Sequence, residues 1–240
     1  MKHLILITTL FIGLNGCAQQ ELNLIPYVLE QLNLNIENVK TDLMVSKIHP
    51  DNPKETIVVI PEIAEASGDH FTLNSYILIT DTETGKIKYT YFESAKTNEW
   101  DSSAVRLERI KIDTTTYAIA KNKNAFGVRV YYRGSSGPNP FYYETISLFV
   151  VESNALKNVL KNYTIDSFSG EWDTHCAGEF TDHKKILSVS CNKTNGFFDL
   201  LIENTITERE TFVTNDNDCD EKITINTEKR TLKYVNGNYK

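Results

Sequence analysis

The 240-residue sequence predicts an all-β protein, built mainly from antiparallel hairpins, with one short helix near its N-terminus. From residue 57 onward, apolar runs of strand length alternate with polar turn residues, and the runs are rich in β-branched and aromatic side chains. In residues 126–133 large apolar side chains recur at every second position, which is the period of a strand with one face in a core. Helical spacing is clear only before residue 40.

The N-terminal helix is predicted from Leu22, Ile25, Leu29 and Leu32, which recur at intervals of three and four residues. Pro26 suits the first turn of a helix, because the N–H that proline lacks would have no partner there. We therefore expect one short helix, after a brief tether that ends near residue 24.

The rest of the chain is expected to form five strand–turn–strand units, and the last unit places its turn at residues 226–229. The units begin roughly 32 to 40 residues apart, close to the ~40 residues of one propeller blade. A small irregular β-propeller is therefore one expected architecture, and a β-sandwich with evenly spaced hairpins is the alternative. The units centre on residues 77–92, 109–121, 146–165, 186–202 and 223–234.

The first seventeen residues have the organisation of an export signal. Lys2 precedes an apolar run over residues 4–14, which is too short to cross a ~30 Å hydrocarbon core. Leu14-Asn15-Gly16-Cys17 resembles a lipobox, the motif in which a lipid is attached to the cysteine thiol before cleavage. The sequence therefore predicts a signal peptide over residues 1–16, a lipidated Cys17, a tether over 17–24 and a single domain over 25–240.

The predicted location is the cell envelope, with the lipid on Cys17 as the membrane attachment. Ala18 after that cysteine favours the outer membrane, and both the periplasm-facing and the surface-exposed orientation stay open. Loss of residues 1–16 removes one lysine and leaves 24 basic and 32 acidic side chains, a net charge of −8. An acidic domain without a basic stripe argues against nucleic acid as a partner. The sequence predicts no cofactor.

Three further cysteines, Cys176, Cys191 and Cys219, would lie in an oxidising compartment after export, where one disulfide and one thiol are expected. Cys191 alternates with Leu187 and Val189, so we expect its side chain to face inward as a shielded free thiol. Cys176 and Cys219 lie in polar stretches typical of loops or strand ends. A Cys176–Cys219 disulfide is therefore predicted, and Cys176–Cys191 is the runner-up.

Residues 195–202 resemble the core of an FG-GAP repeat, in which a glycine turn precedes Asp-Leu at the start of a strand. In that motif calcium binds just upstream, but this chain has Cys191 and Lys193 where carboxylates are expected. A lysine opposes binding of a hard cation, so the resemblance implies an element without a metal.

A second acidic stretch contains Asp216, Asp218 and Asp220, whose alternation suits an oxygen-ligand loop. Glu221 stands where a calcium-binding EF-hand loop needs glycine, and Thr227 stands where it needs glutamate. We therefore expect a solvated turn, and the sequence predicts no metal site.

The densest group of aromatic and hydrogen-bonding residues lies between positions 125 and 180. Arginine, tyrosine and tryptophan are the residues that dominate binding hot spots. The structural alternative is that Arg129 pairs with Glu171 or Asp173 across strands and that Trp172 fills a core. The predicted binding residues are Arg129, Tyr131, Arg133, Tyr142, Trp172, Asp173 and His175.

The same region carries a wider resemblance. The residue runs 125–130, 134–136, 139–140 and 170–174 (AFGVRV, GSS, NP and GEWDT) are similar to secreted proteins and lipoproteins of Gram-negative bacteria. The resemblance extends over about residues 70 to 240. It implies a secreted setting and no particular chemistry.

The expected function is binding of a protein, a glycan or another envelope component, including protection of the envelope from a toxin or hydrolase. No catalytic residues are predicted, because the sequence lacks a nucleophile elbow, a His-Glu-x-x-His motif and a phosphate-binding loop. The rival hypothesis is an envelope hydrolase that uses Asp173, His175 and Glu179, which requires those side chains to converge. A passive structural role is the third hypothesis.

The lipobox predicts that the Cys17→Ser variant is not acylated. Without the acyl chains the mature domain should leave the membrane fraction, because no other apolar stretch is long enough to anchor it. Fractionation of cells that express each form measures this. A Cys17→Ser protein that still sediments with membranes, with no partner to hold it there, would contradict the lipidation.

Overall fold

The computed structural model describes residues 16–240, and side chains from residue 24 onward. Residues 1–15 of the predicted signal peptide and the side chain of Cys17 lie outside the described residues. Helix α1 (Gly16–Leu32) begins at the last residue assigned to the signal peptide and includes the whole segment assigned to the tether, and Pro26 lies in its interior rather than in its first turn. The first-turn prediction was wrong because the helix extends N-terminally beyond the apolar repeat. No helix in the described part is long and apolar enough to span a membrane.

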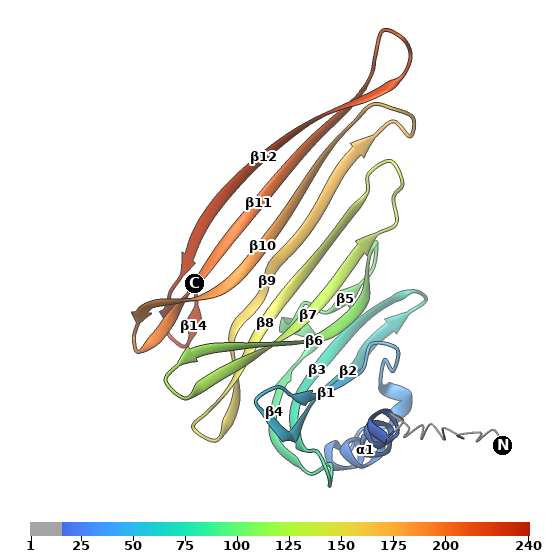
Figure 1. The fold of residues 1–240 in the computed structure, drawn as a ribbon. Helices are drawn as coiled ribbons and strands as arrows, with labels where there is room; N and C mark the ends of the chain where they lie inside the picture. Colours follow the sequence, from blue (N-terminus) through green and yellow to red (C-terminus); the bar gives the residue numbers. More distant parts are fainter. Residues whose placement is uncertain (1–15) are drawn as a thin grey trace, which may run out of the picture.

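The all-β prediction is confirmed, since antiparallel strands make up most of the described chain in two sheets and a small hairpin (Figure 1). The first sheet, sheet A, contains β1 (Val45–His49), β2 (Asn52–Ser67), β3 (His70–Asp81), β4 (Ile87–Glu93) and β5 (Asp101–Ser102). The second, sheet B, contains β6 (Val105–Ala120), β7 (Lys123–Gly134), β8 (Phe141–Glu152), β9 (Ala155–Trp172), β10 (Gly178–Thr194), β11 (Phe197–Val213) and β12 (Cys219–Leu232). The remaining elements are a 3-10 helix (Ile36–Asn38), α2 (Ala95–Asn98), β13 (Tyr234–Val235) and β14 (Asn238–Tyr239).

The propeller expectation was wrong, and the sandwich alternative fits. Strands β6 to β12 are hydrogen-bonded in sequence order within one sheet, which is not closed, whereas a propeller would divide them into separate blades. The even spacing along the chain reflects long strands of similar length. Residues 109–121 lie almost wholly in β6, and residues 226–229 pair with β11 as part of β12 instead of forming a turn. The polar character of 226–229 reflects an exposed strand.

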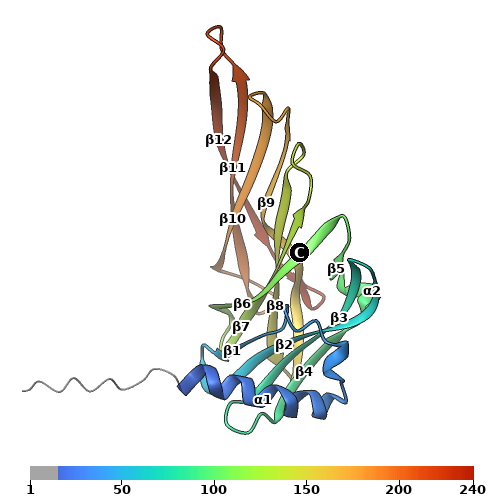
Figure 2. The same cartoon turned by 90° about the vertical axis from the view of Figure 1, so that its right-hand side faces the viewer.

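Sheet A lies between two layers. On one face Val58 and Ile60 pack against Val28 and Leu29 of α1, which lies across the sheet (Figure 2). On the other face Ile57, Val59 and Ile77 pack against sheet B. Because successive side chains of a strand point to opposite faces, the unbroken apolar run 57–60 serves both layers.

A further core forms where sheet B folds over itself. Strands β9 and β10 pair only between residues 166–172 and 178–184, and beyond this they separate. The lower ends of β10 to β12 then lie over β6 to β9, and β6 contacts β11. This core includes Ile146, Leu148, Leu200 and Leu232, and the β13–β14 hairpin adds Tyr234. The other ends of β9 to β12 extend away from sheet A (Figure 1).

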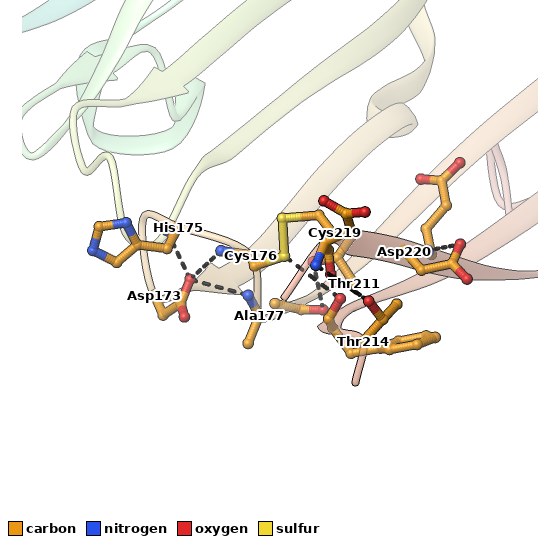
Figure 3. The surroundings of a disulfide bond; sticks show 12 residues. Asp173, His175, Cys176, Ala177, Thr211, Thr214, Cys219 and Asp220 are labelled. Atoms are coloured by element: carbon orange, nitrogen blue, oxygen red, sulfur yellow. Dashed lines mark hydrogen bonds between the residues drawn. A yellow bond between two sulfur atoms is a disulfide. The ribbon is translucent and has the colours of Figure 1, made fainter. Parts of the chain in front are cut away.

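The predicted disulfide is confirmed. Cys176, in the loop between β9 and β10, is bonded to Cys219 at the start of β12, with Cα atoms 5.5 Å apart (Figure 3). The bond closes a separation of 43 residues and ties the tips of two neighbouring hairpins together.

Among the cysteines whose side chains the structure describes, Cys191 is the free one, as predicted, but it is exposed instead of shielded. The pairing of β10 with β11 shifts between Val189 and Lys193. These two residues are four positions apart on β10, but their partners Leu200 and Phe198 are only two positions apart on β11. This irregularity reverses the alternation, so Ser190 is buried and Cys191 points outward. The sequence pattern contains no sign of the bulge.

Replacing both disulfide cysteines, as Cys176→Ser with Cys219→Ser, should destabilise the fold by roughly 3 to 4 kcal/mol, the chain-entropy value for a loop of this length. Urea unfolding under non-reducing conditions measures the loss. Cys191→Ser is the matched control and should leave stability unchanged, because its exposed thiol is unbonded. Equal stability of the double variant and the native chain would show that the disulfide contributes little.

Candidate functional site

Four aromatic side chains form a row across neighbouring strands of sheet B, on the face opposite to sheet A. We call Tyr131 (β7), Tyr142 (β8), Phe168 (β9) and Phe180 (β10) the aromatic ladder, and this face the ladder face. The ring centroids of successive members are 5.7, 5.4 and 5.9 Å apart. Tyr142 and Phe168 are directly opposite in the register, and the other two contacts are diagonal. Such cross-strand pairs stabilise a sheet.

Arginine side chains cover both ends of the aromatic ladder. The Arg109 guanidinium lies 4.7 Å from the ring centroid of Tyr131, and that of Arg209 lies 4.8 Å from the centroid of Phe180. These distances are those of cation–π contacts. The ring faces are therefore used within the molecule, and a ligand would reach ring edges and tyrosine hydroxyl groups.

Two glycines make room for the Phe180 ring. A Cβ atom on Gly170, which is directly opposite Phe180 on β9, would lie 2.4 Å from that ring, and one on Gly178 would lie 2.9 Å from it. Any larger residue at Gly170 would displace the ring from Phe168. The glycines thus set the position of the last aromatic of the ladder.

Beside the aromatic ladder lies an ion-pair cluster. The Arg129 guanidinium donates to Asp113 at 2.6 and 2.8 Å and to Glu144 at 3.2 Å. Burial disfavours the charge on Asp113, but the N–H of Thr115 and the guanidinium together hold its pKa below the usual range. Arg129 is therefore a partly buried structural arginine. Its partners are carboxylates on β6 and β8, not the Glu171 or Asp173 that the sequence suggested.

An acidic pair, Asp166 on β9 and Asp182 on β10, lies next to this cluster. Each has one buried carboxylate oxygen without a hydrogen-bond partner in the described structure. Burial, followed by the charge of Asp182, raises the pKa of Asp166. Burial and the same two carboxylates also raise the pKa of Tyr142 to about 12. The immediate surroundings of Asp166 and Asp182 therefore disfavour a further negative charge.

A hollow of about 570 Å³ opens where the aromatic ladder meets the loop between β7 and β8. Arg106 and Arg133 are directly opposite each other on β6 and β7, and neither is in an ion pair with any described residue. Like charges in directly opposed positions destabilise a sheet. A bound anion would remove that repulsion. We call this site the arginine hollow; it is lined by Arg106, Glu108, Tyr131, Arg133, Tyr142, Phe168 and residues of the loop 134–141.

Of the predicted binding residues, the structure brings Tyr131, Arg133 and Tyr142 together in the arginine hollow. Arg106 and Phe168 were missed. Both lie outside the strand–turn–strand units that the sequence predicted, and the residue that faces each of them depends on a strand register that one sequence does not reveal.

Trp172, Asp173 and His175 lie apart from the arginine hollow, at the tip of the β9–β10 hairpin. Asp173 Oδ1 accepts hydrogen bonds from the backbone N–H groups of His175, Cys176 and Ala177 at 2.8, 2.9 and 3.1 Å (Figure 3). The first of these bonds contributes most to lowering the pKa of Asp173. Its carboxylate therefore shapes the loop. Trp172 is 38% exposed, so it does not fill a core.

The side chains of the hydrolase hypothesis do not converge. Asp173 and Glu179 line one shallow hollow of about 610 Å³, whereas His175 lines another of about 400 Å³. No hydrogen bond joins any two of these three side chains in the described structure. Within residues 24–240 no group of three or more His, Cys, Asp or Glu side chains is arranged to hold a metal ion. The geometry therefore gives the hydrolase hypothesis no support.

Comparison of the chain with protein-family models, with curated proteins and with solved structures gave no match. The case for a function therefore depends on the chemistry of the described side chains.

The raised pKa of Asp166 predicts a pH-dependent effect of Asp166→Asn. A raised pKa means that the folded chain binds this proton more tightly than the unfolded chain does, so the group lowers stability once the pH exceeds that pKa. The variant should therefore melt at a higher temperature than the native chain at pH 7. The gain should shrink as the pH falls through the raised pKa toward the usual value of about 3.9.

Thermal unfolding at a series of pH values tests this. Asp216→Asn is the matched control, since Asp216 is exposed in the β11–β12 loop, and it should change nothing. A lower melting temperature of Asp166→Asn at pH 7 would show that the ionised carboxylate stabilises the fold.

Proposed function

We propose that this protein is an envelope lipoprotein that binds a small anionic ligand in the arginine hollow. The lipid on Cys17 would hold the β domain at the outer membrane, as Leu14-Asn15-Gly16-Cys17 and Ala18 suggest. The single observation that carries the binding function is the direct opposition of Arg106 and Arg133 in a hollow, with neither in an ion pair with a described residue.

The ligand chemistry follows from the lining. A guanidinium presents a planar fork of donors that matches a carboxylate or a phosphate, and two of them can hold one anion from both sides. Ser135 and Ser136 add hydroxyl groups at the rim. The aromatic edges of Tyr131, Tyr142 and Phe168 provide apolar contact for the body of the ligand.

The size of the hollow favours a small ligand over a protein. Pockets for small molecules measure about 300 to 1,000 Å³, and this one falls within that range at about 570 Å³. An acidic sugar unit combines an anionic group, several hydroxyl groups and a partly apolar ring. We therefore propose a glycan that carries carboxylate groups as the ligand.

Titration calorimetry with the full-length chain in detergent micelles tests this proposal. The probes are a hexuronic acid disaccharide, the neutral hexose disaccharide of the same linkage, and inorganic phosphate. The uronic acid should bind, and Arg106→Gln or Arg133→Gln should each weaken it about tenfold or more, because a charged hydrogen bond contributes roughly 1.5 to 3 kcal/mol.

The matched control is Lys121→Gln with Lys233→Gln, which removes two exposed positive charges: Lys121 lies in the β6–β7 turn, at the other end of these strands from the Arg106–Arg133 pair, and Lys233 follows β12. It should leave binding unchanged. Equal binding of phosphate and uronic acid would show that the site binds anions in general and would overturn the proposal that its ligand is a sugar. Failure of both anions to bind, or binding of the neutral sugar with equal strength, would overturn the proposed function.

A further inference from the structure

Strand β12 is a long free edge of sheet B. It pairs with β11 over all fourteen of its residues without a register shift, and no described strand lies on its other side (Figure 1). Every residue from Cys219 to Thr231 is exposed, including Ile223 at 50% and Ile225 at 64%. The outer N–H and C=O groups of such a strand are ready to pair with another strand.

Most of the usual protections of an edge are absent here. Natural edge strands are short, contain proline or a bulge, or lie under a loop or helix. β12 has none of these features, whereas β6, at the opposite edge of the same sheet, has three register shifts. Charged residues are the remaining protection, and in β12 their order along the strand is itself informative.

The charges on the two sides of the middle of β12 are complementary when one side is read in reverse. On one side of Ile225 the chain has Asp220-Glu221-Lys222, and on the other side it has Glu228-Lys229-Arg230. Reversal of the strand about Ile225 therefore places each charge opposite its complement. We propose that β12 pairs antiparallel with β12 of a second copy of this chain, with Ile225 opposite Ile225 of the partner subunit.

In this register all the facing charges are complementary. Asp220 faces Arg230 of the partner subunit, Glu221 faces Lys229 of the partner subunit, and Lys222 faces Glu228 of the partner subunit. The two-fold symmetry repeats each pair, and no like charges face each other. The contact is self-complementary, as a two-fold interface requires.

Neighbouring registers are penalised. A slide of two residues places Asp220 opposite Glu228 of the partner subunit in one direction, and Lys222 opposite Arg230 of the partner subunit in the other. A slide of one residue would place the ladder face of one subunit on the same side as the opposite face of the other subunit. Like charges that directly face each other destabilise a pair of strands, so these neighbouring registers are disfavoured, and the register centred on Ile225 is the one that pairs all six charges with their complements.

The pairing also extends ion pairs that are present within the chain. On the ladder face Arg209 lies 4.0 Å from Glu221, and Lys229 lies 2.9 Å from Glu203. The pairing connects these contacts into a row of alternating charges that crosses both subunits. Ile225, the most exposed apolar side chain of β12, gains an apolar neighbour opposite it.

Cysteine cross-linking of the full chain tests the register, in a Cys17→Ser, Cys191→Ser background so that no native thiol competes, since Cys176 and Cys219 are bonded to each other. Ile225→Cys should give a disulfide-linked dimer under mild oxidation, because directly opposed residues have Cα atoms about 4.5 to 5.5 Å apart. Thr227→Cys is the matched control. Its counterpart would lie four residues along the strand, roughly 14 Å away, so it should not cross-link.

Charge reversal tests the complementarity. In sedimentation equilibrium the native chain should have the mass of two chains. Lys222→Glu should weaken the dimer roughly tenfold, since it creates two like-charge pairs. Adding Glu228→Lys to Lys222→Glu should restore the native affinity, which a merely unstable variant could not do.

Three results would overturn the proposal. These are a single-chain mass at every concentration tested, equal cross-linking of the Ile225→Cys and Thr227→Cys variants, and failure of the double charge reversal to restore association. The proposal is independent of the arginine hollow, because Arg106 and Arg133 lie on strands at the opposite side of sheet B.

Discussion

The strands of sheet B are longer than the layers that cover them, and most of the structure follows from this constraint. Sheet A and the folded-over ends of β10 to β12 bury the lower part of the sheet on both faces. Beyond that point a single layer of backbone-paired strands projects from the body (Figure 1). Between residues 203 and 213 only Asn204 is buried. A sheet without a second layer lacks the apolar burial that normally stabilises it.

The projecting layer is held by contacts within its own plane. The aromatic ladder links four strands through side chains that lie on the sheet, and the Cys176–Cys219 bond ties the hairpin tips. The aromatic ladder and the disulfide stabilise these strands through contacts between neighbouring strands, where no second layer buries them. Both leave one face of the strands open to solvent. The same contacts position the arginine hollow, because Tyr142 and Phe168 belong to the ladder and also line the hollow. Stability and the candidate site therefore share residues, and a variant of the ladder should affect both.

The sequence was informative wherever a structural feature depends on residues that are close together in the chain. The alternation over residues 126–133 predicted which side chains of β7 enter the core, and all four apolar positions are buried. The polar surroundings of Cys176 and Cys219 predicted the disulfide. The errors arose where the outcome depends on a neighbouring strand. The bulge that exposes Cys191 exists only in the register of β10 with β11, and the opposition of Arg106 with Arg133 exists only in that of β6 with β7. Residues 226–229 were predicted to form a turn because they are polar. They are polar because they lie in an exposed edge strand, which buries neither of its faces.

The disulfide is relevant both to the predicted location of the chain and to its exposed edge strand, β12. A bond of this kind persists in an oxidising compartment outside the cytoplasm, which agrees with the export signal inferred from the first seventeen residues. Cys219 is the first residue of β12, so the bond to Cys176 fixes the end of that strand against the neighbouring hairpin. In a reducing compartment the Cys219 end of β12 would keep only its pairing with β11, and an edge that frays exposes backbone groups without a defined register. The bond therefore keeps this end of β12 in place for the proposed pairing with a second chain.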